Sequence, residues 1–124
     1  MRLTVHRLTA IPAQQQHYVD LIVVDHSLPS EADFYLATFN EKAVALAWRQ
    51  QQQLQFIAVR DITRRRGVGK ELVRQIKHDI AQKKLTPLTF CLSEVPKEQQ
   101  PELAAFLTSQ GFNLQEGVLN WKVD

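Results

Sequence analysis

The sequence of 124 residues lacks the features that mark several large classes of protein. Its one cysteine, Cys91, cannot form an internal disulfide, so a disulfide-stapled secreted domain is excluded. The apolar neighbours Phe90 and Leu92 predict that this thiol is structural and lies in a strand. No apolar run has the length of a signal-peptide core or a membrane span, so we expect a cytoplasmic protein with no membrane segment.

An excess of charge of one sign is also missing, because 15 lysines and arginines stand against 13 acidic residues for a formal net charge of +2. General nucleic-acid binders carry a stronger basic excess, so no nucleic-acid partner is expected. The histidines are not spaced like metal ligands, and no metal site is expected; they are His6, His17, His26 and His78. Any anion that the protein binds should therefore meet a local site.

A chain of this length can close one hydrophobic core, so we expect a single domain over residues 1–124. Alternating apolar residues predict a strand over residues 3–8. Pro12 suits the first position of a helix, whose apolar residues follow the polar run Gln14 to Gln16 at helical spacing; they are Tyr18, Leu21, Ile22 and Val24. Residues 27–33 then predict a surface connection.

The next segment predicts a meander of strands. Apolar runs at residues 34–39 and 43–48 flank Asn40-Glu41-Lys42, a composition that favours a hairpin. A glutamine-rich turn is expected over residues 49–53. In the strand that follows and ends near Arg60, three apolar residues alternate with Gln55, Ile57 and Val59; they are Leu54, Phe56 and Ala58.

The second half predicts a long helix and a return to strands. From Val68 the apolar residues form one helical stripe, made up of Val68, Leu72, Val73, Ile76 and Ile80. A short buried strand is expected over residues 88–92, and another helix runs to Gln110 and stops at Gly111. Closing strands are expected over residues 112–114 and 118–123. Together these elements predict an α/β (α+β) domain with a mixed, mostly antiparallel sheet flanked by helices.

The junction between the third meander strand and the long helix carries the chemistry. There Thr63 and three arginines precede Gly67-Val68-Gly69. The first amides of a helix have no partner inside the helix, and the helix dipole adds positive charge at the same place. Glycines let the backbone approach an anion closely, and an arginine can add charge-assisted hydrogen bonds. The pattern therefore predicts a diphosphate site, with a tight turn and a solvated basic patch as the alternative.

The pattern Arg-x-x-Gly-x-Gly, formed by Arg64, Gly67 and Gly69, resembles the acetyl-coenzyme A loop of GNAT-type N-acetyltransferases. The order of elements is similar over nearly the whole chain and includes a terminal Gly111-Phe112 like that of the GNAT family. The resemblance implies the GNAT acyl-CoA N-acyltransferase-like fold and acetyl-CoA or CoA as cofactor.

A second resemblance is more specific. The segments Phe39-Asn40-Glu41 and Val59-Arg60-Asp61-Ile62-Thr63-Arg64-Arg65-Arg66-Gly67-Val68-Gly69 resemble the PanZ/PanM family of GNAT-like factors. It implies a protein that, loaded with acetyl-CoA or CoA, binds the pyruvoyl-dependent aspartate 1-decarboxylase PanD. The partner's maturation and activity in pantothenate and β-alanine biosynthesis would then be regulated.

The resemblance also implies site residues. The backbone of Ile57, Ala58 and Val59 would pair with the pantetheine arm. The pyrophosphate would be held by the segment Thr63, Arg64, Arg65, Arg66, Gly67, Val68, Gly69 and Lys70. The residues that would face PanD are Asn40, Arg64 and Arg65. One position departs from the family pattern, because Thr38 stands where an arginine is usual.

An active N-acetyltransferase is the alternative function. GNAT enzymes generally use a base for the amine and an acid, often tyrosine, for the departing thiolate. The usual acid position, four residues before Gly111, is Leu107, which cannot donate a proton. Asp61 and Glu94 are conceivable bases, but exposed carboxylates are more often solvated or paired. No catalytic residue is assigned, and we favour a non-catalytic regulator over an active enzyme.

Overall fold

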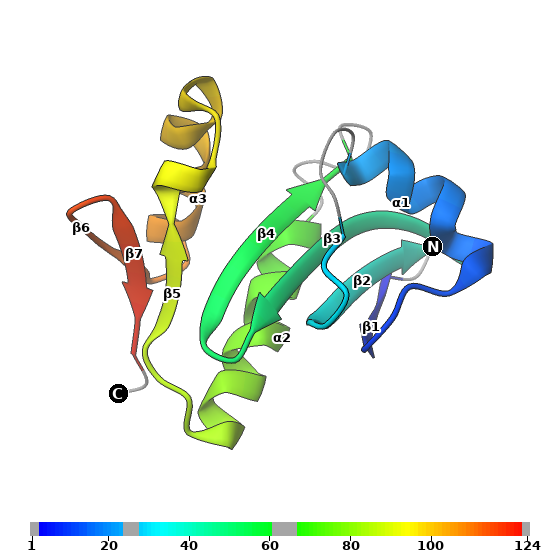
Figure 1. Cartoon of the computed structure of the whole chain (residues 1–124), viewed down its shortest axis with the longest axis horizontal. Helices are drawn as coiled ribbons and strands as arrows, with labels where there is room; N and C mark the ends of the chain where they lie inside the picture. Colours follow the sequence, from blue (N-terminus) through cyan, green and yellow to red (C-terminus); the bar gives the residue numbers. More distant parts are fainter. Residues whose placement is uncertain (1–2, 24–27, 61–66, 123–124) are drawn as a thin grey trace.

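The computed structural model describes residues 3–23, 28–60 and 67–122 (Figure 1). Its strands are β1 (Leu3–Leu8), β2 (Asp33–Phe39), β3 (Lys42–Gln50), β4 (Gln53–Val59), β5 (Leu88–Cys91), β6 (Asn113–Gln115) and β7 (Val118–Trp121). Its α-helices are α1 (Gln16–Val23), α2 (Val68–Lys83) and α3 (Gln100–Ser109). Single 3₁₀ turns cover Ala13–Gln15, Leu92–Glu94 and Lys97–Gln99. The predicted order of strands and helices is confirmed.

The strands form one seven-stranded sheet in the order β1-β2-β3-β4-β5-β7-β6. Neighbours are antiparallel except for β4 and β5, which are parallel. The parallel pair requires a crossover, and α2 supplies it between the two strands. The predicted α/β class with a mixed, mostly antiparallel sheet is therefore confirmed.

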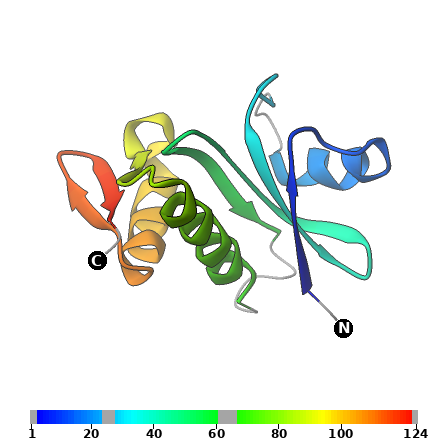
Figure 2. The same ribbon diagram turned by 90° about the horizontal axis from the view of Figure 1, so that it is seen from below.

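Helices cover both faces of the sheet, which explains why β2 and β3 are almost continuously apolar. In β2, Phe34 and Leu36 join the core beneath α1, whereas Tyr35 and Ala37 join the core beneath α2 and α3. Figure 2 shows α1 and α2 on opposite sides of the strands. Successive side chains point to opposite faces, so a strand buried on both needs apolar residues at every position.

A bulge in β4 corrects the predicted face of that strand. Trp48 pairs with Phe56 and Arg49 with Leu54, so Gln55 has no partner in the ladder. The extra residue reverses the alternation. Leu54 therefore lies in the α2 core, whereas Phe56 and Ala58 pack on the α1 side, where Phe56 stacks on Trp48. The strand was predicted correctly, but its three alternating residues do not share a face.

The turn predicted over residues 49–53 is shorter than expected. Arg49 and Gln50 belong to β3, Gln53 begins β4, and the turn consists of Gln51 and Gln52. Arg49 is only 2% exposed, because Tyr35 and Asp33 of the neighbouring strand β2 bind its guanidinium. A polar run indicates a turn only when no distant partner pairs with it.

The helices agree with the sequence to different degrees. All five predicted stripe residues of α2 are buried. In α1 the buried residues are Val19, Ile22 and Val23, whereas Leu21 is 51% exposed, so its predicted place on the apolar face is wrong. Gly111 adopts a φ of +97° after α3, as its predicted stop position requires. Among the described residues, no helix is long and apolar enough to cross a membrane.

Candidate functional site

The candidate anion site lies at the start of α2. Gly67 precedes the helix with a φ of +77°, and apart from its chain neighbours no described residue has an atom within 4 Å of the place where its Cβ would stand. The first helical bond runs from the amide of Glu71 to the carbonyl of Gly67, at 3.0 Å. The preceding amides, those of Val68, Gly69 and Lys70, have no acceptor inside the helix. Within the described part of the chain, no side chain caps this end.

Gly69 is needed for a different reason than Gly67. A Cβ atom at Gly69 would lie 3.0 Å from Cζ of Phe106 and 3.6 Å from Cγ2 of Val59. The absence of a side chain thus lets the first turn of α2 pack closely on α3 and β4. Val68 beside it is buried, whereas Lys70 is exposed. The helix start is therefore packed against the core through Val68 and Gly69, while Lys70 lies at the surface.

Glu71 places a carboxylate in the first turn of α2, where it could compete with a bound anion for the free amides. Its side chain turns along the helix and accepts hydrogen bonds from Arg74, at 2.6 and 2.9 Å, and from Gln75, at 2.9 Å. The bonds from Arg74, followed by the bond from Gln75, lower the pKa of Glu71 to about 2. The carboxylate is therefore ionised at neutral pH and paired with Arg74.

The end of β4 lies beside this helix start, and its backbone groups point alternately towards β3 and away from it. The amide of Arg60 donates to the carbonyl of Val44 in β3, at 2.8 Å. Because backbone direction alternates, the amides and carbonyls of Val59 and Ile57 point to the opposite side. On that side the described ladder with β5 is the single pair Gln53–Thr89, and Figure 1 shows the two strands diverging from there.

The turn between β2 and β3 lies at the same end of the sheet. It consists of Asn40 and Glu41, both exposed and both with positive φ, +51° and +67°. The side-chain amide of Gln15 clamps it: Nε2 donates to the carbonyl of Glu41 at 2.8 Å, and Oε1 accepts from the amide of Ala43 at 3.1 Å. In the sequence Gln15 is one residue of the polar run Gln14 to Gln16. No local pattern predicts its contact with the turn.

Several other predicted positions can also be placed. Thr38, at the family's arginine position, is buried, and its Oγ1 lies 3.3 Å from Nε2 of His6. Leu107 is fully buried in the core beneath α2 and α3. Cys91 ends β5 and is partly buried, with its sulfur 3.9 Å from Nε2 of Gln53. No metal-binding group of histidine, cysteine or carboxylate residues occurs among the described residues.

Some predicted residues cannot be placed. Asp61, Thr63 and the three arginines Arg64, Arg65 and Arg66 lie outside the described residues, as does the side chain of Glu94. The positions that are described, Ile57 to Val59, Gly67 to Lys70 and Asn40, come together at one end of the sheet.

Comparison with known proteins identifies the family. The model of an acetyltransferase (GNAT) domain, PanZ, matches residues 2–120. The chain belongs to the PanZ family. A PanD regulatory factor of Salmonella typhimurium is 33% identical over 124 residues, covering 93% of this chain and 94% of the relative. The predicted PanZ/PanM resemblance is confirmed, and the chain is a homologue of that factor.

Solved structures support the GNAT fold of this PanZ-family chain. YhhK from Escherichia coli, solved bound to coenzyme A, superimposes with a TM-score of 0.79 at 24% identity, covering 97% of this chain and 98% of that one. A GNAT family acetyltransferase from Elizabethkingia anophelis with acetyl-CoA bound has a TM-score of 0.62 at 15% identity, with 98% of each chain covered. At these identities the similarity establishes the fold, and the predicted GNAT architecture is confirmed.

Proposed function

We propose that this PanZ-family protein binds acetyl-CoA or CoA and, so loaded, binds aspartate 1-decarboxylase, PanD. Through that contact it would promote maturation of the decarboxylase and regulate its activity in pantothenate and β-alanine biosynthesis. The observation that carries the proposal is the match to the Salmonella PanD regulatory factor over almost the whole of both chains.

The geometry at the start of α2 supports a cofactor with a diphosphate. The amides of Val68, Gly69 and Lys70 are directed out of the helix end, and Gly67 adds no side chain that would block an anion there. Arg64, Arg65 and Arg66 precede them in the sequence and would supply the counter-charge.

The end of β4 supports an extended amide chain attached to that diphosphate. A pantetheine arm carries amides like those of a peptide, so it can pair with the backbone of the segment Ile57 to Val59 as an added strand would. It would lie where β4 and β5 diverge. The reactive end of the arm would then lie between these strands.

The turn at Asn40 supports a protein partner at the same end of the molecule. Asn40 is exposed in a turn that Gln15 clamps through Glu41 and Ala43, so the turn presents a preformed surface. A partner that contacts Asn40, Arg64 and Arg65 would touch the cofactor loop as well. Cofactor binding and PanD binding would therefore be coupled.

A regulatory role is supported over acetyl transfer by Leu107. The side chain at the usual acid position is aliphatic and fully buried, so it cannot protonate a thiolate. Release of free thiol from acetyl-CoA in the presence of a defined amine, above the rate without protein, would favour an active N-acetyltransferase instead.

The experiment is calorimetric titration of PanD with this protein, with and without acetyl-CoA. Ligand-dependent association is expected, and equal or absent binding in both titrations would refute the proposal. The variant Arg65→Glu should weaken association, whereas Lys84→Glu, a charge reversal at the other end of α2, should not.

Cofactor binding is tested separately by thermal unfolding with acetyl-CoA and with CoA. A ligand held only by the native state at 100 times its Kd adds about 2.7 kcal/mol of stability, or roughly 10 °C in Tm for a domain of this size. No shift with either ligand would refute cofactor binding.

A further inference from the structure

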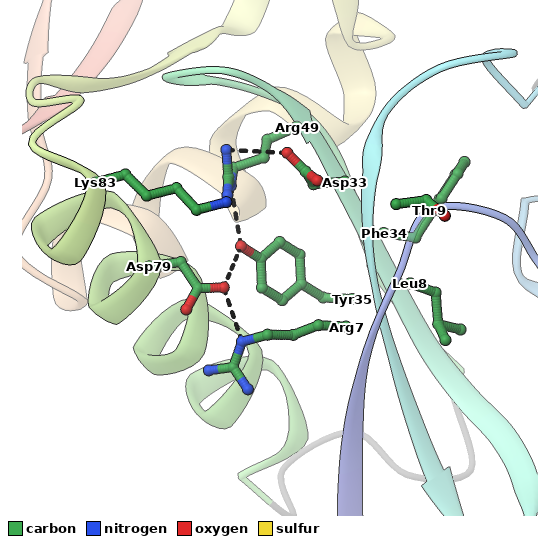
Figure 3. Close-up of a pocket in the computed structure, with 9 residues that line it drawn as sticks. All are labelled: Arg7, Leu8, Thr9, Asp33, Phe34, Tyr35, Arg49, Asp79 and Lys83. Carbon is green, nitrogen blue, oxygen red and sulfur yellow. Dashed lines mark hydrogen bonds and ion pairs between the residues drawn. The ribbon is translucent and has the colours of Figure 1, made fainter.

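A cavity of about 160 Å³ lies at the end of α2 opposite Gly67 (Figure 3). It is lined by the start of β2, the end of β3, the end of β1 and the last turn of α2. Helix α2 has 16 residues and so spans about 24 Å, which separates the cavity from Gly67 at its other end.

One wall of the cavity is a rigid network centred on Tyr35. Its hydroxyl donates to Oδ2 of Asp79 at 2.7 Å and accepts from Nε of Arg49 at 2.9 Å. Burial, together with the carboxylate of Asp79, raises the pKa of Tyr35 against the opposing effect of Arg49, so the hydroxyl remains a donor. Figure 3 shows the three side chains in a continuous chain of contacts.

The acidic groups of the cavity are already paired. Asp79 accepts from Nε of Arg7 at 2.8 Å, and Asp33 lies 3.2 Å from Nη1 of Arg49. Burial alone would raise the pKa of Asp79, but the bonds from Arg7 and Tyr35 and the charges of both arginines lower it. Lys83 lines the same cavity and has no ion-pair partner among the described residues, so the wall carries an excess of positive charge.

Two of the three guanidinium nitrogens of Arg49, Nε and Nη1, have partners in the described structure. Nε bonds Tyr35, and Nη1 bonds the carbonyl of Gln51 at 2.7 Å and the carboxylate of Asp33. Nη2 has no partner in the described part of the structure. Every fully buried side-chain nitrogen or oxygen atom there does have a partner, so Nη2 must be accessible to solvent. Nη2 of this otherwise buried side chain therefore faces the cavity that Lys83 also lines.

We propose that this cavity binds a small oxyanion, a carboxylate or a phosphate, between Nη2 of Arg49 and the ammonium of Lys83. Lys83 adds a positive charge beside the Arg49–Asp33 ion pair, and a buried guanidinium edge is a strong, directional donor to either group. The hydroxyl of Thr9 lines the same space and can donate as well.

The rest of the ligand is small and polar. Thr9, Asp33 and Arg49 also line an adjoining hollow of about 720 Å³, whose other walls are polar side chains and one alanine. The side chains that would face the ligand there are Ser30, Glu31, Gln50, Gln51 and Gln53. Amide and hydroxyl groups of this kind suit a hydrogen-bonding molecule rather than an apolar one.

The test is a titration of the ¹⁵N-labelled protein with sodium malonate and, separately, with inorganic phosphate, each against sodium chloride of equal ionic strength. Saturable shifts are expected at the amides of Thr9, Asp33, Arg49 and Lys83 with at least one probe. Which probe saturates distinguishes a carboxylate from a phosphate ligand. Shifts at Gly67 to Lys70 report the cofactor loop separately, so the outcome does not depend on CoA binding.

The variant Lys83→Gln should weaken the saturating probe about tenfold, the loss expected for one charge-assisted hydrogen bond. Lys84→Gln, at the neighbouring exposed lysine, is the matched control and should leave the affinity unchanged. Lys83 is exposed, so its replacement should not unfold the protein. Shifts no larger than those with chloride, or equal affinity in the two variants, would overturn the proposal.

Discussion

The clamp of Gln15 on the Asn40–Glu41 turn makes a sharp prediction. Glu41 holds a φ of +67°, a left-handed conformation that costs about 1–2 kcal/mol for a residue with a side chain. Gln15 stabilises it with one bond to the carbonyl of Glu41 and one from the amide of Ala43. Replacing Gln15 by leucine removes both bonds and leaves the amide of the fully buried Ala43 without that acceptor.

Two net hydrogen bonds are worth about 1 kcal/mol each, so Gln15→Leu should lower the free energy of unfolding by roughly 2 kcal/mol. Urea denaturation measures this loss. Amide hydrogen exchange at Ala43 should accelerate at the same time, which localises the effect to the turn. Gln14→Leu is the matched control, because Gln14 is exposed and lies beside Gln15 in the same 3₁₀ turn.

A second substitution distinguishes loss of the Gln15 contact with the turn from a general loss of stability. Glu41→Gly removes the side chain that makes positive φ costly, so the turn should need the clamp less. The double variant should therefore lose less stability than the sum of the two single changes. If PanD binds as proposed, its affinity should fall in Gln15→Leu and partly return in the double variant, while the CoA-dependent thermal shift stays constant. Unchanged exchange at Ala43 in Gln15→Leu would refute the reasoning.

Three further predictions concern the described core and cavity. Tyr35→Phe should cost about 1–3 kcal/mol in urea denaturation, because a buried hydroxyl that joins two charged groups is lost. Gly69→Ala should destabilise the protein by about 1–3 kcal/mol, because the new methyl group clashes with Phe106. Gly67→Ala should destabilise it only through the cost of the positive φ. Crystal structures of the two variants should show Phe106 displaced in Gly69→Ala and not in Gly67→Ala. Folding lowers the pKa of Asp79, so the carboxylate stabilises the native state above its ordinary pKa of 3.8, and this stabilisation is lost as the pH falls below that value. The loss of stability in acid should be smaller in Asp79→Asn. Urea unfolding at a series of pH values measures it.

Local patterns predicted much of the fold. The apolar residues of α2 recur at helical spacing, and all five are buried. They could be predicted because a helix that packs one face on a sheet needs apolar residues at that spacing, whatever the rest of the fold. The hairpin around Asn40 and Glu41 was also predicted, since a short polar interval between apolar runs favours a turn whatever packs beside it. The cofactor site was predicted in the same way, from a contiguous run that ends at Gly69, and of that run the structure describes Gly67 to Gly69 at the start of α2.

Other features were decided by residues far apart in the sequence. The bulge at Gln55 moves Phe56 to the opposite face from Leu54, and it depends on the register with β3. Arg49 is buried because Asp33 and Tyr35 surround its guanidinium, although its own neighbours indicate a turn.

The amino-acid sequence by itself therefore determined the order of the elements, the long helix and the place of Gly67 at its start. The tertiary structure alone decided which polar side chains are enclosed, as for Arg49, and which hold a distant turn, as for Gln15. The physical reason is that burial of a charged or amide group is tolerated only where its hydrogen-bond partners are supplied, and here strands and turns remote in the chain supply them.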